Sequence, residues 1–140
     1  MVDDVIVNKV AIIERCLTRV TEEYDGDERN LRHNLTRQDS IILNLQRACE
    51  ASIDLAMALI KVHRLGPPQE SRHAFELLGE AGLLDSELTV RMARMIGFRN
   101  VAVHDYQRLN LDIVKAIILE RLDDFRTFGR VALELARRKS

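Results

Sequence analysis

The stretch Ser40–Val62, SIILNLQRACEASIDLAMALIKV, is apolar on nearly every side. At 3.6 residues per turn it forms two apolar helical faces and leaves only a narrow polar strip. One apolar face consists of Ile42, Leu45, Cys49, Ile53, Ala56 and Ile60, and the other of Ala48, Ala51, Leu55, Leu59 and Val62. The polar strip consists of Arg47, Glu50, Asp54 and Lys61. Such a helix is buried on most sides, in a bundle or against a second subunit. Gly66-Pro67-Pro68 closes it.

The remaining helices follow from the same periodicity. Apolar residues at steps of three or four predict helices over residues 4–24, 71–81, 86–103 and 111–137, and the polar residues 28–37 are interpreted as the solvated start of the long helix. Ser86 and Asn110 are expected to cap the helices that they precede or begin. The expected fold is all-α: a four-helix up-and-down bundle with about five helices, whose short connections favour antiparallel neighbours.

Composition limits the class of protein. With 140 residues, 46% of them hydrophobic, the chain is expected to be a single domain over residues 1–140 with its own core. A formal net charge of −1 gives no overall attraction to nucleic acid, so any RNA contact needs a local basic patch. Cys16 and Cys49 are interpreted as reduced core thiols. An acidic N-terminus and the lack of an apolar run of about 18 residues predict a cytoplasmic protein.

A second stretch, Met92–Tyr106 (MARMIGFRNVAVHDY), carries the candidate chemistry. Arg99 occupies a position of its helix at which an apolar residue would normally face the core, and a guanidinium there needs a partner. A neighbouring stripe is interpreted as a shallow recess with an amide and an imidazole at one end; it consists of Ala93, Gly97, Asn100 and His104. Guanidinium binds phosphate oxygens and imidazole titrates near neutrality, so the group could hold and act on a phosphate. On spacing alone, packing or ion pairing is the commoner reason for an Arg and a His five residues apart on a helix.

The order of residues in this segment resembles a known signature. Gly97-Phe98-Arg99-Asn100-Val101, followed by Val103-His104-x-Tyr106, is similar to the motif of HEPN domains, and specifically of the HepT-like toxin branch. That motif is an Arg, a polar residue, a His after four to six intervening positions and, in this branch, a Tyr two residues later. The resemblance extends through residues 51–56, 71–78 and 82–85 and covers roughly residues 5–135. It implies a bundle of the HEPN type.

The resemblance also implies an activity. HepT-like proteins are metal-independent endoribonucleases, the toxins of type II/VII-like toxin–antitoxin systems, and work as homodimers whose two motifs face a shared cleft. The RNA would be tRNA or mRNA, cleaved without a metal or other cofactor. In this chain His104 would be the general acid or base, Arg99 would hold the phosphate, and Asn100 would orient the imidazole or contact the phosphate. Asp54, an acid in the long helix, would support Arg99, or else pair within its own helix.

Tyr106 has two interpretations. As a structural residue it would extend the stripe of Arg99 into the core or an interface, with its hydroxyl hydrogen-bonded. The resemblance implies that it is the site at which a minimal nucleotidyltransferase antitoxin, MntA, attaches AMP. The added charge and bulk beside Arg99 and His104 would then repel RNA phosphates.

Two other kinds of protein stay open. A non-catalytic HEPN module would bind a nucleotide or dock a nucleotidyltransferase without cutting RNA. A purely structural bundle would use Arg99 and His104 only in ion pairs, so their replacement by Ala would lower the melting temperature and change no activity.

Overall fold

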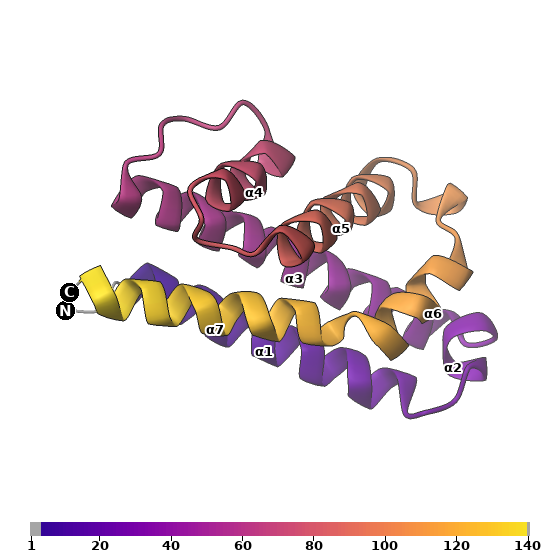
Figure 1. Ribbon diagram of the computed structural model, residues 1–140. Coiled ribbons are helices and arrows are strands. Elements are labelled where there is room, and N and C mark those ends of the chain that lie inside the picture. Colours follow the sequence, from indigo (N-terminus) through magenta and orange to yellow (C-terminus); the bar gives the residue numbers. More distant parts are fainter. Residues whose placement is uncertain (1–3, 140) are drawn as a thin grey trace.

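The computed structural model describes residues 4–139 and is helical along nearly all of that range (Figure 1). Its α-helices are α1 (Asp4–Tyr24), α2 (Arg29–Arg32), α3 (Leu35–His63), α4 (Ser71–Glu80), α5 (Ser86–His104), α6 (Leu111–Glu120) and α7 (Leu122–Lys139), with the 3₁₀ helix η1 (Tyr106–Arg108) between α5 and α6. No strand occurs among these residues. The predicted all-α class is confirmed.

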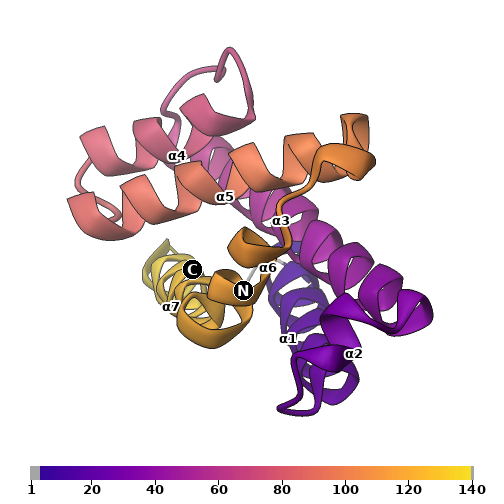
Figure 2. The ribbon, with the colours of Figure 1, turned by 90° about the vertical axis from the view of Figure 1, so that its right-hand side faces the viewer.

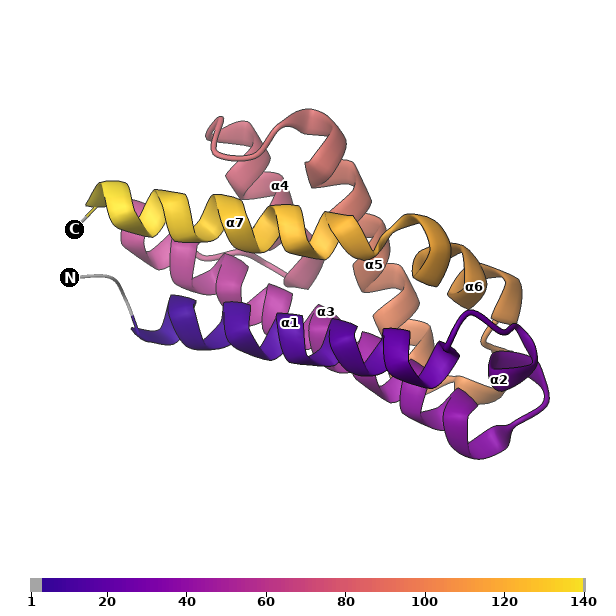
Figure 3. The ribbon, with the colours of Figure 1, turned by 90° about the horizontal axis from the view of Figure 1, so that it is seen from below.

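Helix α3 is the axis of the fold. It contacts α1, α2, α4, α5 and α7. The hairpin of α4 and α5 lies on one side of α3, and α1 and α7 lie on the other (Figure 2). Helix α1 begins at the end of the bundle where α7 finishes, while α2 and α6 meet at the opposite end (Figure 3). This central position is the one predicted from the two apolar faces of the long helix.

The core forms where those faces meet their neighbours. Most of the predicted inward residues of α3 are buried: Ile42, Leu45, Ala48, Cys49, Ala51, Leu55, Ala56, Leu59 and Ile60. The rings of Phe75 on α4 and Phe128 on α7 meet edge to face, with centroids 5.4 Å apart, and are fully buried. Cys16 and Cys49 are buried free thiols, and burial raises the pKa of each. None of the helices within residues 4–139 is long and apolar enough to cross a membrane.

Two of the predicted helices are interrupted. Residues 28–37 do not run straight into the long helix: α2 ends at Arg32, and α3 starts after Asn34, whose side chain accepts a hydrogen bond from the Arg37 amide. Amide capping by Asn competes with helix continuation, which is why the chain breaks there. The last helix, predicted as continuous, breaks at Arg121 into α6 and α7. Five helices were expected, and the described range holds seven α-helices.

The break at Arg121 brings α6 against α2. Lys115 on α6 pairs with Glu28 at 2.5 Å, and Asp112 pairs with Arg32 of α2 at 2.5 Å. The partners of these pairs lie 87 and 80 residues apart in sequence, so no local pattern predicts them. At the start of α6, Asn110 caps the helix as expected, accepting a hydrogen bond from the Asp112 amide.

The other predicted ends need small corrections. Ser86 is not the N-cap of α5: Asp85 is, and its carboxylate accepts a hydrogen bond from the Leu88 amide at 2.7 Å. An ionised acceptor at the positive end of a helix is a stronger cap than a hydroxyl, which leaves Ser86 as the first helical residue. At the end of α3, Arg64 is the C-cap and takes the left-handed conformation, with φ of 56°, and Gly66 two residues later also has a positive φ, 88°.

The buried aromatic pair predicts a large stability effect. Replacing Phe128 by Ala is expected to lower the free energy of unfolding by about 3–5 kcal/mol, because it removes the ring and leaves a cavity against Phe75. Urea denaturation followed by circular dichroism measures it. The matched control is Leu119→Ala, at a side chain 59% exposed on α6, where a change within about 0.5 kcal/mol is expected. Equal effects of the two substitutions would contradict this account of the core.

Candidate functional site

Arg99 lies in the last two turns of α5 and faces α3. Its Nη2 lies 3.3 Å from Oε2 of Glu50, and its Nη1 donates to Oδ1 of Asn100 at 3.1 Å. The side chain is 25% exposed, and its Nε is buried without a hydrogen-bond partner. The guanidinium is therefore held at the surface of the bundle by two acceptors and stays partly exposed, which is a suitable arrangement for binding an anion.

Asp54 is not the partner of Arg99. Its carboxylate pairs with Lys9 of α1 at 3.0 Å, and the acid opposite Arg99 is Glu50. The two acids are four residues apart on the polar strip, about one helical turn, so the prediction missed by one turn of α3. The alternative of a pair within α3 is also wrong for Asp54, because its partner is on α1.

His104 is the last residue of α5 and is exposed. Within residues 4–139 no hydrogen bond or ion pair engages its imidazole. Positions five apart on an α-helix are separated by about 140° around the axis, so Arg99 and His104 point to different sides of α5. The structure joins Arg99 and Asn100 by a hydrogen bond, whereas no hydrogen bond within residues 4–139 joins His104 to either of them, although Asn100 lies one turn before it on the same face of α5.

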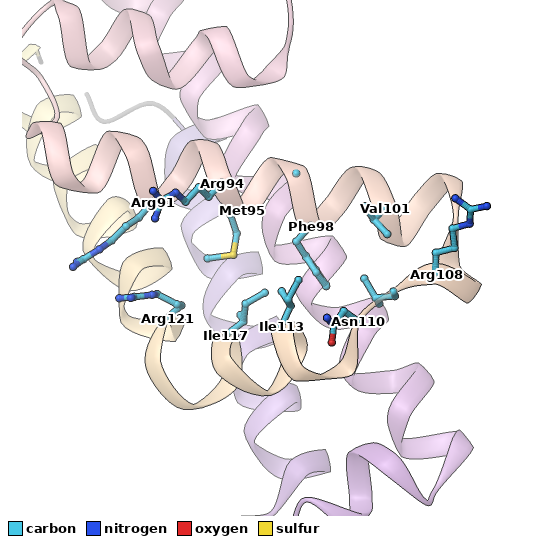
Figure 4. A pocket seen from close by; sticks show the side chains of 12 residues that line it. Arg91, Arg94, Met95, Phe98, Val101, Arg108, Asn110, Ile113, Ile117 and Arg121 are labelled. Carbon is cyan, nitrogen blue, oxygen red and sulfur yellow. The ribbon is translucent and has the colours of Figure 1, made fainter.

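The recess predicted along α5 is displaced from the motif. A cavity of about 350 Å³ lies between α5, the loop after it and α6 (Figure 4). Its walls are Arg91, Arg94, Met95, Gly97, Phe98, Val101, Arg108, Leu109, Asn110, Ile113, Ile117 and Arg121. Of the predicted stripe only Gly97 lines it; Ala93, Asn100 and His104 do not. The cavity lies on the adjacent face of α5, which α6, the helix that ends at the break at Arg121, covers only in part.

Tyr106 lies just beyond α5, in η1, and reaches back to α3. Its hydroxyl donates a hydrogen bond to Oδ1 of Asp39. Partial burial and the neighbouring Asp39 carboxylate raise the pKa of Tyr106. The expected hydrogen-bonded hydroxyl is therefore confirmed, but the residue does not extend the stripe into the core: it is 39% exposed, and Val103 before it is exposed as well.

Two acidic residues of α3 thus hold the segment from Arg99 to Tyr106 against that helix. Asp39 and Glu50 are eleven residues apart, about three helical turns, so they lie on the same side of α3. Glu50 holds Arg99 and Asp39 holds Tyr106. Sequence reasoning missed both partners. Glu50 was visible as an acid on the polar strip of the long helix, whereas nothing local marks Asp39, which lies 67 residues from Tyr106.

A second cavity adjoins Asp39. It has a volume of about 520 Å³, lies between α1 and α3, and is lined by Ile12, Arg15, Cys16, Arg19, Asp39, Ser40, Leu43, Asn44 and Arg47. Three arginines thus surround the side of α3 next to Asp39, which is a local basic patch in a chain of nearly balanced charge. No group of three or more His, Cys, Asp or Glu side chains suited to a metal ion occurs in the described part of the chain.

Two known proteins are similar to this chain in sequence. The mRNA nuclease HepT of Shewanella oneidensis is 47% identical over 126 residues, which are 90% of this chain and 94% of that protein. A putative RNase of Archaeoglobus fulgidus is 31% identical over 81 residues, 57% of this chain and 60% of the relative.

Solved structures give the same result. The tri-AMPylated Shewanella oneidensis HEPN toxin in complex with MNT antitoxin superimposes with a TM-score of 0.87 at 46% identity, covering 92% of this chain and 96% of that one. A toxin–antitoxin crystal structure with AMP-PNP gives a TM-score of 0.88 at 45% identity, covering 93% and 98%. The model of the protein family described as "Ribonuclease HepT-like" matches residues 13–131 of this chain. The chain, whose Arg99–Tyr106 segment carries the resemblance noted from sequence, belongs to the ribonuclease HepT-like family.

Proposed function

We propose that this HepT-like ribonuclease is the toxin of a toxin–antitoxin pair and cleaves RNA as a metal-independent endoribonuclease, with Arg99 and His104 as its catalytic residues. The observation that carries the assignment is the state of Arg99. Its guanidinium is oriented by Glu50 and Asn100, and the side chain stays 25% exposed, so the group is positioned and still open to an anion. A phosphate oxygen is the acceptor that such a group binds best.

The chemistry needs few groups because RNA carries its own nucleophile, the 2′-hydroxyl. Attack on the adjacent phosphorus requires that a proton leave the hydroxyl and that another reach the leaving oxygen, and an imidazole performs either transfer near neutral pH. Arg99 stabilises the charge that develops on the phosphorane. Asn100 accepts a hydrogen bond from Arg99 and thereby fixes the orientation of the guanidinium. No step of this mechanism uses a metal ion.

A homodimer is part of the proposal. Within one protomer Arg99 and His104 diverge around α5, so one chain presents a phosphate clamp on one side and a proton carrier on another. A second copy related by a two-fold axis would place a histidine of each chain at a shared cleft and supply both an acid and a base. Leu43 and Met57 support this arrangement, because both are exposed apolar side chains of α3 and each lies seven residues, about two turns, from Glu50, the partner of Arg99.

The regulatory part of the proposal concerns Tyr106. Relatives of this chain have been solved with an MNT antitoxin, one of them tri-AMPylated. Tyr106 is exposed at the end of the motif segment, where a partner enzyme reaches its hydroxyl. We place AMP on this tyrosine, transferred from ATP by a nucleotidyltransferase antitoxin, with the effect of blocking RNA at Arg99 and His104. A cytoplasmic location follows from an RNA substrate.

The test of the nuclease uses the chain produced without an antitoxin. It is incubated with total tRNA and with a messenger transcript in excess EDTA, and the products are resolved on a denaturing gel. Cleavage that survives the chelator is expected. Cleavage restored only by added Mg²⁺ would overturn the metal-independent mechanism. Absence of cleavage by the folded, unmodified dimer under both conditions would favour the nucleotide-binding module.

The partner of Arg99 gives a further prediction. Glu50→Ala is expected to lower the cleavage rate about tenfold to a hundredfold, because Arg99 loses the contact that orients it towards the phosphate. Asp54→Ala, four residues away on the same helix, pairs with Lys9 instead and is the matched control, with an unchanged rate. Initial rates on one transcript at equal protein concentration measure both. A larger loss for Asp54→Ala would show that the orientation of Arg99 does not depend on Glu50.

A further inference from the structure

Tyr106 has an acidic neighbour that lies outside the Arg-His motif. Its hydroxyl donates a hydrogen bond to Asp39 of α3, and both side chains lie at the surface, within reach of a partner enzyme. We propose that Asp39 is the base that accepts the Tyr106 proton when the hydroxyl is AMPylated, so that the toxin itself supplies a catalytic group for its own inactivation. This inference rests on the modification of Tyr106 proposed above.

The chemical need for a base is clear. A tyrosine hydroxyl ordinarily ionises at a pKa of about 10, and partial burial beside Asp39 raises the pKa of Tyr106 further. The neutral phenol therefore prevails near pH 7 and is a weak nucleophile towards a phosphate ester. A base within hydrogen-bond reach removes this difficulty by taking the proton in the transition state. Protein kinases use an aspartate in this way to accept the proton of a substrate hydroxyl.

The step balances with the groups named. Oη of Tyr106 forms a bond to the α-phosphorus of a nucleoside triphosphate bound by the antitoxin. The bond from that phosphorus to its bridging oxygen breaks, and the electron pair leaves with pyrophosphate. The proton of the hydroxyl passes along the existing hydrogen bond to Oδ1 of Asp39 and then to water. Nothing is oxidised or reduced.

The charges around Asp39 favour the approach of a phosphate. A lone carboxylate would repel the nucleotide, but Asp39 lines the cavity between α1 and α3 together with Arg15, Arg19 and Arg47. Arg19 pairs with Glu22 and Glu23, whereas no ion pair in the described range engages Arg15 or Arg47. The guanidinium groups of Arg15 and Arg47 thus offset the negative charge of Asp39 on the side that faces the cavity. The other charged and titratable groups that line this cavity are these arginines and the Cys16 thiol, and Tyr106 contacts Asp39 through its hydrogen bond.

A purely structural contact makes a different prediction from a proton acceptor. Asp39→Asn keeps an oxygen that accepts the Tyr106 hydrogen bond but cannot take its proton. If Asp39 is the base, this variant lowers the rate constant of AMP transfer about 10²- to 10⁴-fold and leaves the KM for the toxin chain nearly unchanged. Its rate then rises with pH as the phenolate forms without help, while the wild-type rate stays comparatively flat. A structural contact alone raises KM and leaves the pH profile unaltered.

The experiment measures AMP transfer directly. The full chain is incubated with the antitoxin of the Shewanella oneidensis complex, Mg²⁺ and ATP labelled at the α-phosphate, and initial rates are taken from neutral pH to about pH 10. Asp54→Asn is the matched control, since it removes an exposed carboxylate from the same helix and is expected to react at the wild-type rate. Asp39→Glu restores a carboxylate and is expected to recover part of the rate. Melting temperatures confirm that each variant is folded.

The outcomes separate the two proposals. Equal labelling of wild type and Asp39→Asn at every pH overturns the role of Asp39 and leaves the modification of Tyr106 standing. A slower Asn variant whose pH profile matches that of wild type, with raised KM, also overturns it in favour of a structural contact. If the wild-type chain takes up no label, or if Tyr106→Phe takes up as much as wild type, the proposed modification itself fails and this inference fails with it.

Discussion

His104→Ala is expected to lower the rate of RNA cleavage about 10²- to 10⁴-fold, the range by which a general acid or base accelerates a reaction. The substitution should leave the fold intact, because His104 is exposed at the end of α5 and has no hydrogen-bond partner among residues 4–139. Single-turnover cleavage of a messenger transcript in excess EDTA measures the loss. Melting temperature, followed by circular dichroism, is expected to stay at the wild-type value.

The control for this prediction is a second exposed histidine. His33, between α2 and α3, lies outside the motif, and His33→Ala is expected to cleave at the wild-type rate. Arg99 is tested by Arg99→Lys, which keeps a positive charge opposite Glu50 but loses the forked donors that match a phosphate. Wild-type cleavage by His104→Ala would remove the imidazole from the mechanism and favour a site elsewhere on the bundle.

Tyr106→Phe is expected to abolish control by the antitoxin while preserving toxicity. The change keeps the ring and deletes the hydroxyl that would accept AMP, so the mass increase of the chain on incubation with antitoxin and ATP should disappear. Cells that produce this variant together with the antitoxin should stop growing, as they would with unmodified toxin alone. Intact-mass measurement and growth curves read the two effects separately.

The matched substitution is Tyr24→Phe. Tyr24 is the other tyrosine of the chain and is buried in α1, so its hydroxyl is out of reach of a partner enzyme. This variant should still gain mass and be neutralised. Neutralisation of Tyr106→Phe without any gain in mass would mean that the antitoxin acts by binding alone, and AMP transfer to this tyrosine would then not be its mechanism.

Periodicity predicted the parts of the fold whose cause is local. The end of α1 at Tyr24 was predicted, and the two apolar faces of α3 identified the central helix, because the buried stripe of a helix consists of residues three and four apart. The breaks at Asn34 and Arg121 were missed for a different reason. Each depends on a cap or on charges of another helix, as with Lys115 and Glu28. Apolar spacing continues unchanged through Arg121, and the polar residues 28–37 hold no apolar pattern that marks the break at Asn34.

The candidate site, like the fold, has a part that the sequence predicts and a part that it does not. The motif residues were found from their order in the sequence, but their partners were not. Choosing between Asp54 and Glu50 requires the axial position of α5 against α3 to within one turn, and hydrophobic pattern does not fix that register. The contact between Tyr106 and Asp39 could not be predicted, because the turn of η1, rather than α5 itself, directs Tyr106 to Asp39. Long-range polar contacts of this kind follow only once the helices are placed.

The hydrogen bond from Tyr106 to Asp39 can exist only while the tyrosine keeps its proton. A phosphodiester oxygen has nothing to donate, and a carboxylate can only accept, so after esterification two acceptors and two negative charges would face each other across the same gap. The modified ring then has to swing away from α3, and η1 loses its anchor to that helix. One covalent event would thus release the connection between α5 and α6, and faster amide exchange over residues 105–110 would report that release independently of any RNA assay.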